Sequence, residues 1–470
     1  MCGITGFIGF DDDVLLRKMS AIIKHRGPDQ SGIFTDEHVG LAHRRLSIID
    51  LKDGKQPIHN EDESVWVVYN GEIYNHVSLR NKLEKKGHRF YTNSDTEVIV
   101  HAYEEYGLNF ASHFNGCFAF ALWDKVNKRL VCVRDRVGIK PFYYTIVGNS
   151  FLFASEIKSL LIHPDVERAV DMQALNHFMS FRFTPNPSTL FKNIHSLGPG
   201  QVLVFEKGSI KLKKYWGVEL SKGSIEEKNE NYYASKIREL LDDSVRMRLM
   251  SEVPLGVYLS GGMDSSSIVA SMSKMVDEPI KTFSVGFSDS KYDETKDAQI
   301  VADEFGTDHH VLRLESDCMK HLAKAIWHLD TPAVNAASVP TMLLSDFAGK
   351  KVKVVLNGDG GDEIFGGYDR YAVGMKLMKY RKIAPSLLRT KVVSPLVRTV
   401  LGRRGLYGRF SELMDNLDDD SRMYMCLGSA FTDSEKKNAC VNPFDHNIVR
   451  SDTFISKCLD DKKMDPLQRM

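Results

Sequence analysis

The sequence predicts a mixed α/β fold with a β-rich first half of packed sheets and a second half built around a doubly wound parallel sheet. Two observations predict it. Up to residue 216, strand-like segments outnumber helical patterns, which favours sheets packed face to face with helices outside. After residue 232, strand and helix patterns alternate, as they do in βα units. A chain of 470 residues is also long enough for two or three domains.

The elements of the first half follow from apolar spacing. A helix is expected over 14–25, ended by the turn signal HRGPD at 25–29. Two further helical patterns cover 76–86 and 95–106. A strand is expected after Cys2, and alternation or β-branched residues predict five more, at 40–49, 64–69, 117–123, 130–134 and 151–154.

In the second half, a polar stretch at 217–231 without apolar period reads as a linker. An amphipathic helix follows at 233–248. The expected strands are 253–259, 281–287, 309–314 and 351–356, and the helices between them are 268–275 and 297–305.

Composition excludes several classes of protein. Sixty-two basic residues balance 62 acidic ones, so no overall field favours nucleic acid or an anionic membrane. No run approaches the ~18 apolar residues of a membrane span, and the first residues lack the layout of a signal peptide. The seven cysteines are scattered without a C-x-x-C pair, which is typical of reduced thiols. We therefore expect a cytoplasmic protein that binds neither nucleic acid nor membrane.

The second residue is a cysteine, which is an unusual position for a thiol. Removal of Met1 would leave Cys2 at the N-terminus, with a nucleophile and a base in one residue. The thiolate is the reactive form of cysteine. A free α-amino group, with a pKa of roughly 7.7–8.0, can take the thiol proton near neutral pH. A chance cysteine in an N-terminal strand is the alternative interpretation.

Three other positions in the first half carry more chemistry than a scaffold needs. Asn70-Gly71-Glu72 ends a predicted strand, and its amide and N–H donors could form an oxyanion hole or simply a turn. The Arg45 guanidinium could donate a bidentate pair of hydrogen bonds to a substrate carboxylate, or the side chain could lie solvated at the surface. Asp95 could hold an ammonium group or cap the helix that follows it.

The motifs of the first half are more informative about function in combination and in their order than any one of them is alone. MCGI, HRGPD, HRRLSIIDL, NGEIYN, SDTEV, CFAFALWD and RDRVGIKPFYY follow one another within residues 1–144. This series closely resembles the N-terminal-nucleophile glutaminase domain of class II glutamine amidotransferases. The resemblance implies an αββα sandwich over residues 2–216 with Cys2 as the nucleophile. The other implied roles are oxyanion donors at Asn70 and Gly71, and glutamine binding by Arg45, Asn70, Glu72 and Asp95.

A phosphate-binding layout opens the second half. The predicted strand 253–259 runs directly into SGGMDSS at 260–266, and a helix follows. Backbone N–H groups and the helix dipole favour an anion at such a turn, and glycines let the backbone approach it closely. The lysine of a Walker loop is absent, and the motif instead resembles the pyrophosphate loop of enzymes that cleave ATP between the α and β phosphates. Asp264 would then face Mg²⁺, since carboxylates suit that ion; a glycine-rich turn with a capping serine is the alternative.

An acidic loop follows the last predicted strand. It reads NGDGGDEIFGGY at 357–368. Ligands of open parallel sheets sit beyond the carboxyl ends of the strands, so this loop could hold a metal ion. A solvated acidic turn is the alternative. Asp293 is a weaker metal candidate that reads equally well as a helix cap.

LGVYLSGGMDSS and DEIFGGY are similar to the synthetase domain of glutamine-hydrolysing asparagine synthetases, and this resemblance runs to about Tyr371. It implies a domain of the ATP-pyrophosphatase type over 232–470. The implied ATP-binding residues are Ser260, Gly261, Gly262, Asp264, Ser265, Val285, Gly286 and Gly358. The implied residues facing Mg²⁺-pyrophosphate are Asp264 and Asp362.

Two departures from that family's pattern leave the acceptor open. The family loop most often reads Ser-Gly-Glu-Gly, and its glutamate would assist attack by ammonia. Here Asp359 keeps the carboxylate but is one methylene shorter. The chain also ends at Met470 without the family's usual lysine-bearing helical segment, so we expect the synthetase domain to be incomplete.

The resemblance implies a two-step activity. Glutamine is hydrolysed to glutamate and ammonia, and ATP with Mg²⁺ activates the aspartate side chain as an acyl-adenylate that ammonia converts to asparagine, with AMP and pyrophosphate released. Glutamine, aspartate and ATP are the expected small-molecule partners, and a homodimer is a further expectation. Two alternatives stay open: the same mechanism on another carboxylate, such as a sugar acid, or a truncated nucleotide-binding protein that makes no amide.

Residues 375–470 are the least informative part of the chain. Basic residues recur at helical spacing over 376–409, interrupted by Pro385 and Pro395. Because the chain as a whole carries no net charge, we interpret them as a solvated helical face. The histidines without metal-ligand spacing are interpreted as ordinary: His43, His59, His309 and His310.

Overall fold

The computed structural model describes residues 1–218, 228–288, 293–315, 317–332, 335–400, 405–439 and 448–459. Contacts group them into two compact units. The first comprises Met1–Ala169, Phe191–Val218 and Lys228–Gly358, and the second holds residues 170–190 and those from Asp359 onward. Residues 219–227, the centre of the predicted linker, lie outside the described part. Within the described ranges, no helix has the length and apolar character needed to cross a membrane.

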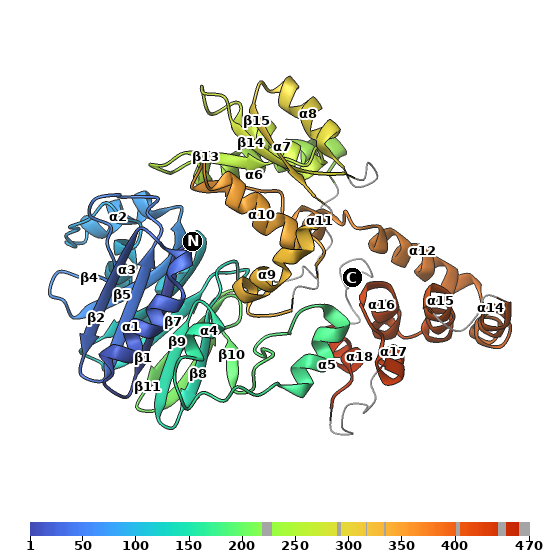
Figure 1. Cartoon of the computed structure of the whole chain (residues 1–470), viewed down its shortest axis with the longest axis horizontal. Coiled ribbons are helices and arrows are strands. Elements are labelled where there is room, and N and C mark those ends of the chain that lie inside the picture. The colour runs from blue at the N-terminus through green and yellow to red at the C-terminus, as the bar shows by residue number, and fades with distance from the viewer. Residues whose placement is uncertain are drawn as a thin grey trace. The chain divides into compact units, whose positions relative to one another are not determined.

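Two six-stranded antiparallel sheets form the β-rich part of the first unit (Figure 1). The first sheet has the order β10-β8-β9-β1-β3-β2: Ile194–Ser196, Tyr143–Val147, Ser150–Ala154, Gly3–Ile8, Val39–Arg45 and Gln30–Asp36. The second has the order β12-β11-β7-β6-β5-β4: Ser209–Lys214, Gln201–Glu206, Arg129–Arg134, Gly116–Asp124, Val65–Ile73 and Ile58–His59. The six strands expected from the sequence are therefore present.

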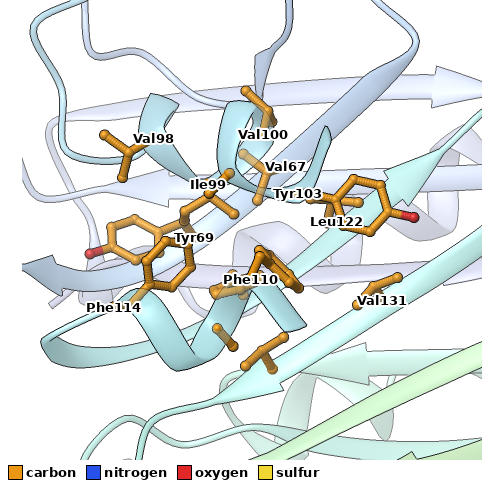
Figure 2. Packing of buried hydrophobic residues seen from close by; sticks show 14 of the residues in the cluster. Val67, Tyr69, Val98, Ile99, Val100, Tyr103, Phe110, Phe114, Leu122 and Val131 are labelled. Carbon is orange, nitrogen blue, oxygen red and sulfur yellow. The ribbon is translucent and has the colours of Figure 1, made fainter. Parts of the chain in front are cut away.

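Buried apolar residues form three layers that hold the sheets and helices together. One layer packs α1 (Asp13–Ile22) and α4 (Ile157–Leu160) on the first sheet. A second layer lies between the sheets and includes Ile4 and Trp123. The third packs α2 (His76–Glu84) and α3 (Glu97–Tyr106) on the second sheet. Figure 2 shows the third layer, whose labelled members include residues of α3, β5, β6 and β7. The order is helix, sheet, sheet, helix, which confirms the predicted αββα sandwich.

The strands that the sequence analysis did not anticipate are mostly short or exposed. β2 and β12 end their sheets, and β12 has a largely exposed SIKLKK sequence without a clean apolar alternation. β10 has three residues. Such strands are held by backbone pairing to a neighbour, and their side chains carry little signal of burial. The helix expected over 95–106 begins at Glu97, with Thr96 at the N-cap, so Asp95 is not its cap.

A four-stranded parallel sheet forms the rest of the first unit, in the order β15-β14-β13-β16 (Figure 1). Its strands are Asp308–Leu314, Lys281–Phe287, Leu255–Tyr258 and Val354–Leu356. One face packs on α6 (Glu230–Arg248), α7 (Met263–Met272) and α8 (Thr295–Glu304), and the other on α10 (Ser338–Ala348). Helices on both faces confirm the doubly wound prediction. The chain reverses its direction of strand addition between β13 and β16, where ligands of such sheets bind.

The second unit is helical in its described residues. Its core joins α12, α15 and α16 through Met378, Leu413, Met414, Leu417, Met423 and Cys426. The helices are α5 Met172–Phe181, α11 Gly361–Phe365, α12 Asp369–Ile383, α13 Ser386–Leu388, η4 Arg389–Val393, α14 Ser394–Val400, α15 Gly405–Asn416, α16 Asp420–Gly428, α17 Asp433–Ala439 and α18 Ser451–Leu459. A short 3₁₀ turn, η3 (Cys318–His321), precedes α9 (Leu322–Leu329) in the first unit.

The predicted solvated basic face needs one correction. Arg389 is buried, with its guanidinium donating to the Asp418 carboxylate at 2.6 Å and to the Ala384 carbonyl at 3.1 Å. Pro385 follows the end of α12 as predicted. Pro395 lies inside a helical run that is continuous from α13 through η4 to α14, and the π-helical segment η4 ends two residues before it. The predicted interruption at Pro395 is therefore present as a change from π to α geometry and not as a break in the helical run.

Candidate active site

A pocket at one end of the sandwich brings together most of the residues predicted in the first half. Cys2 lies just before β1, Arg45 is the last residue of the neighbouring strand β3, and Gly71 and Glu72 lie near the end of β5 in the other sheet. Asp95 comes from the loop before α3. All five line the pocket, together with Leu46, Ile48, Ile49, Gly54, Gln56, Tyr69, Ser94 and Thr96.

The Cys2 thiol is fixed by backbone groups of the residue that follows β3. The Leu46 N–H donates to Sγ at 3.4 Å, and Sγ lies 3.7 Å from the Leu46 carbonyl. Arg26 Nε donates to the Cys2 carbonyl at 2.9 Å, and Arg26 is itself paired with Glu156. Burial raises the pKa of the thiol, so it needs a base to ionise. Burial also lowers the pKa of the adjacent α-amino group, on Met1, to about 6, which leaves an amine there neutral near pH 7.

Asn70 and Gly71 have the properties that an oxyanion hole requires. Asn70 is buried, and its Nδ2 has no hydrogen-bond partner among the described residues. A Cβ at Gly71 would lie 2.3 Å from the Cys117 carbonyl oxygen and 2.6 Å from Phe118 Cα, so only glycine fits against β6. A buried donor without a partner is costly. Gly71 lines the pocket, whereas Asn70 is not among its lining residues, so the structure brings only Gly71 of this pair to the thiol pocket.

Arg45 is a buried cation surrounded by neutral acceptors. Its guanidinium donates to Gln30 Oε1 at 2.9 Å and to the carbonyls of Ile49 and Asp50 at 3.0 and 2.6 Å. Within the described part of the chain it has no ion-pair partner. A Cβ at Gly54 would lie 2.4 Å from Nη2, so glycine is needed beside it. Taking an unpaired charge out of water costs several kcal/mol, and a ligand carboxylate would offset that cost.

Glu72 and Asp95 are the two carboxyl groups that line the pocket. Asp95 Oδ2 accepts from the Tyr69 hydroxyl at 2.7 Å and the Ile73 N–H at 2.9 Å. Glu72 Oε2 has no hydrogen-bond partner among the described residues. Burial raises the pKa of both carboxyls, and the charge of Asp95 raises that of Glu72 further. A pocket with an uncompensated guanidinium and two buried carboxyls complements a ligand that carries both a carboxylate and an ammonium group.

The loop at 46–51 is held from its other side by Glu252, which lies just before β13. Asp50 and Leu51 donate their N–H groups to the two Glu252 oxygens at 2.8 and 3.4 Å, and Glu252 donates its own N–H to the Ile48 carbonyl at 3.1 Å. Asp50 has a φ of +52°, a left-handed conformation that a non-glycine residue adopts at a cost. Glu252 therefore stabilises the conformation in which the loop presents its carbonyls to Arg45.

A second link starts at the residue before β16. Lys353 Nζ lies 2.7 Å from Asp29 Oδ2, and the same oxygen accepts the Ser47 N–H at 2.9 Å. Hydrogen bonds from Lys353 and Ser47 outweigh the desolvation of Asp29 and lower its pKa. Two neighbouring strands of the parallel sheet are thus each preceded by a residue that is linked to the pocket loop, Glu252 directly and Lys353 through Asp29.

The phosphate-type turn after β13 has the predicted geometry. Gly261 has a φ of +82°, and a Cβ there would lie 2.5 Å from the carbonyl carbon of Asp297, so glycine is required. The Ser265 hydroxyl contacts the Ser260 N–H at 3.2 Å and the Ser260 hydroxyl at 3.0 Å, which closes the turn over the start of α7. Ser266 Oγ is buried without a partner among the described residues. This turn has the shape and the free polar groups to accept an anion.

Gly358 and Asp264 meet where the strand order reverses. β16 pairs with β13, and a Cβ at Gly358 would lie 2.8 Å from the Cβ of Asp264. Val285 and Gly286 lie near the carboxyl end of β14, the strand on the other side of β13. The sheet therefore brings the ATP-binding residues predicted in the first unit to one edge.

The remaining predicted residues are found elsewhere. Asp359 and Asp362 belong to the second unit, where the Asp362 carboxylate lies against the backbone of Gly367. Asp293 Oδ1 accepts the Thr295 N–H at 3.2 Å at the start of α8, which fits its alternative reading as a cap. The sequence analysis missed the neutral lining of the pocket, such as Gln56 and Tyr69, because these residue types gave no chemical signal.

The two sites define a class of protein. The chain begins with an αββα sandwich whose Cys2 lies in a pocket, and a doubly wound sheet with an anion-binding turn follows. This is the architecture of a glutamine amidotransferase with a nucleotide-binding domain. Comparison with family models agrees. Residues 1–216 match the glutamine amidotransferase domain, and residues 236–439 match asparagine synthase.

Named relatives extend the match. An asparagine synthetase [glutamine-hydrolyzing] 1 of Bacillus subtilis is 40% identical over 416 residues, covering 86% of this chain and 65% of that protein. A putative asparagine synthetase [glutamine-hydrolyzing] 2 of Methanocaldococcus jannaschii is 38% identical over 434 residues, covering 87% of this chain and 83% of that protein. The chain belongs to the family of glutamine-hydrolysing asparagine synthetases.

A fungal relative shows that the match is not confined to proteins named asparagine synthetase. The amidase chyE of Penicillium rubens is 33% identical over 420 residues, covering 85% of this chain and 62% of that protein. The chain thus spans less than two thirds of the length of the Bacillus subtilis and Penicillium rubens relatives.

Glu72→Gln tests the electrostatics of the pocket through stability. Because burial raises the pKa of Glu72, the folded chain binds more protons than the unfolded chain, and stability falls as the pH rises above the ordinary glutamate pKa of about 4.3. The amide removes that cost, so we expect Tm to rise by roughly 2–4 °C at about pH 8. Below about pH 4.3 the gain should vanish, since both side chains are then neutral.

The measurement is a thermal melt of both proteins across this pH range. Glu37→Gln is the matched control, because the Glu37 side chain is 84% exposed and its charge should matter little. A Tm for Glu72→Gln that equals or falls below that of the parent at alkaline pH would mean that Glu72 is stably ionised.

Proposed function

We propose that this chain is a glutamine-dependent asparagine synthetase that hydrolyses glutamine at Cys2 and amidates the side chain of aspartate with ATP. The observation that carries the proposal is the charge arrangement around the thiol. An unpaired guanidinium lies on one side, at Arg45, and two carboxyls, Glu72 and Asp95, lie on another. This arrangement suits the α-carboxylate and α-ammonium of a free amino acid, and the thiol is then left for its side chain.

In the proposed glutaminase reaction, Met1 is removed and the freed amine of Cys2 accepts the thiol proton. The thiolate attacks the glutamine amide, and Asn70 Nδ2 and the Gly71 N–H stabilise the oxyanion. An unperturbed α-amino group has a pKa of roughly 7.7–8.0, so a substantial fraction of such an amine is neutral near pH 7 and can act as a base. Ammonia leaves, and water hydrolyses the cysteinyl acyl-enzyme to glutamate.

For the second reaction, we propose that ATP binds at the carboxyl edge of the parallel sheet. The turn at 260–265 would receive the phosphates, Val285 and Gly286 would line the nucleotide pocket, and Gly358 would lie near the α-phosphate. The buried, unpartnered hydroxyl of Ser266 and the space that Gly358 leaves beside Asp264 support an anionic ligand there. We assign Mg²⁺ to Asp264, because a carboxylate suits that ion, and the resemblance implies a second carboxylate at Asp362. The ion would neutralise charge on the departing pyrophosphate.

The acceptor is proposed to be aspartate, with glutamine, aspartate and ATP as the substrates. These are cytoplasmic metabolites, so we also propose a cytoplasmic location; the homodimer stays a prediction. A second candidate is the same chemistry on another carboxylate. The shorter acid Asp359 in the acceptor loop favours it, as does the similarity to a fungal amidase. Release of pyrophosphate with aspartate against a panel of sugar acids separates the two candidates.

Cys2→Ser tests the nucleophile. A serine hydroxyl is a poorer nucleophile at this position, so we expect glutamine hydrolysis to fall by roughly 10³-fold or more. Pyrophosphate release driven by added ammonia should be unaffected, because it does not pass through Cys2. The two rates are measured side by side. Glutamine hydrolysis retained at the parental rate would end the assignment.

Asp264→Asn tests the phosphate site. Without the negative charge that faces Mg²⁺, we expect ATP–pyrophosphate exchange to fall by roughly 100-fold while glutamine hydrolysis stays unchanged. Asp277→Asn is the control, since Asp277 is exposed within the same unit. Exchange at the parental rate would mean that the turn at 260–265 does not bind the phosphates.

Glu252→Ala tests whether Glu252 stabilises the pocket loop at 46–51. Two backbone N–H groups lose their acceptor, each worth about 1 kcal/mol, and Arg45 loses part of its support. We expect kcat/KM for glutamine to fall by roughly 5- to 30-fold, mostly through KM. Glu252→Gln keeps one acceptor oxygen and should lose less. Glu278→Ala, at an exposed position, is the control. Equal kcat/KM values for the parent and the three variants would show that the loop at 46–51 keeps its conformation without Glu252.

A further inference from the structure

Four side chains outside the pocket converge on one point beside α3. They are Glu61, His88, His101 and Glu104, and one ligand atom of each lies within 4.8 Å of the others. They come from three places: the loop between β4 and β5, the segment after α2, and α3 itself. His101 is completely buried, whereas both glutamates reach solvent. Histidine nitrogen and carboxylate oxygen are the donors that zinc takes in proteins.

The orientation of His101 is fixed by a buried carboxylate. Glu97 accepts the N–H groups of Tyr91 and Thr92 at 2.8 and 2.7 Å and the Thr92 hydroxyl at 2.6 Å. Because Glu97 accepts from three donors, it acts as an acceptor toward His101 as well. The ring nitrogen that faces Glu97, His101 Nε2 at 3.4 Å, therefore carries a proton. The other ring nitrogen, Nδ1, then presents a lone pair. A carboxylate behind the ring is the usual orienting partner of a metal-bound histidine.

That lone pair faces two further acceptors. Nδ1 of His101 lies 3.4 Å from Glu61 Oε2 and 3.4 Å from Glu104 Oε2, and it has no hydrogen-bond partner among the described residues. Three electron-rich atoms facing one another need a cation between them. A proton on Nδ1 is the competing occupant, because the surrounding carboxylates raise the pKa of His101 to about 9 against its burial. Neither contact has hydrogen-bond geometry, and a metal ion that binds Nδ1 would displace that proton.

The two glutamates are also oriented by donors. Glu61 Oε1 accepts the Arg89 N–H at 2.7 Å, and Glu104 Oε1 accepts Asn60 Nδ2 at 2.8 Å. Each carboxylate therefore turns its other oxygen, Oε2, toward His101. Both donors are neutral groups. They fix the positions of the two carboxylates but do not explain why two acidic groups lie close together.

His88 completes the set. Its Nδ1 lies 3.7 Å from Glu104 Oε2 and 3.7 Å from Glu61 Oε1, and its Nε2 lies 3.8 Å from Glu105 Oε2. His88 thus repeats the arrangement of His101, with one nitrogen toward the cluster and a carboxylate behind the other.

We propose that Glu61, His88, His101 and Glu104 form a structural zinc site. Tetrahedral zinc with bonds of about 2.0–2.2 Å places its ligand atoms about 3.3–3.6 Å apart. Three separations in the cluster are 3.4, 3.4 and 3.7 Å, and all ligand atoms lie within 4.8 Å of one another, so the side chains would close slightly around the ion. The bound ion ties the β4–β5 loop and the segment after α2 to α3. It takes no part in glutamine hydrolysis or ATP chemistry, so the proposal stands apart from the proposed function.

The test measures zinc binding to the full chain. Cys2→Ala is the background, because zinc binds free thiolates and this variant removes the thiol of the pocket. The protein is dialysed against a chelator, and zinc chloride is added by isothermal titration, with the metal content determined after gel filtration. Glu61→Gln and His88→Gln lie at the rim of the cluster, so circular dichroism should show an unchanged fold. His38→Gln is the control, since His38 is exposed in the turn between β2 and β3.

We expect one zinc per chain, a rise of Tm on adding zinc, and at least a tenfold weaker affinity in Glu61→Gln and His88→Gln. The control should bind as tightly as the background protein. Two results would overturn the proposal: no zinc retained after gel filtration, or equal affinity in all variants, which would place the metal elsewhere on the chain.

Discussion

The arrangement of the pocket depends on one buried cation. Arg45 is removed from water at the end of β3, and the groups that surround it are neutral. A guanidinium in that state is stable only if many dipoles point at it. Here the carbonyls of Ile49 and Asp50 do so, and they can because the loop at 46–51 is folded back on the strand end. The thiol of Cys2 contacts the first residue of the same loop. One loop conformation therefore fixes both the proposed nucleophile and the proposed carboxylate-binding group.

That loop is not stabilised from within the sandwich alone. Glu252 accepts two of its N–H groups, and Lys353 reaches Asp29, which accepts a third. Glu252 precedes β13 by three residues and Lys353 directly precedes β16, so both contacts lie at the amino ends of the strands. The anion-binding turn and Gly358 lie at the carboxyl ends of the same two strands. Strands of three or four residues are on the order of 10–13 Å long, so short, hydrogen-bonded elements connect the two sites.

The sequence predicted the sandwich, the parallel sheet and the convergence of Cys2, Arg45, Glu72 and Asp95 well. These predictions depended on local periodicity and on motifs whose residue types carry chemistry. What it could not predict depends on contacts between distant segments. Arg389 lies in a segment whose composition predicts a solvated basic face. In the structure its side chain is buried against Asp418 and the end of α12. The edge strands were missed for the same reason, since their pairing is made by backbone groups.

The proposed zinc site shows the same limit and has a consequence for the pocket. Its ligands are spread from Glu61 to Glu104, with no spacing that a motif would reveal, and only the packing of α3 brings them together. α3 begins at Glu97, two residues after Asp95, and His101 follows one turn later. At 1.5 Å per residue, His101 lies about 6 Å along α3 from Glu97. Any ion that fixes His101 also fixes the start of α3. Through Glu97, which accepts from Thr92, it fixes the loop that carries Asp95 into the pocket.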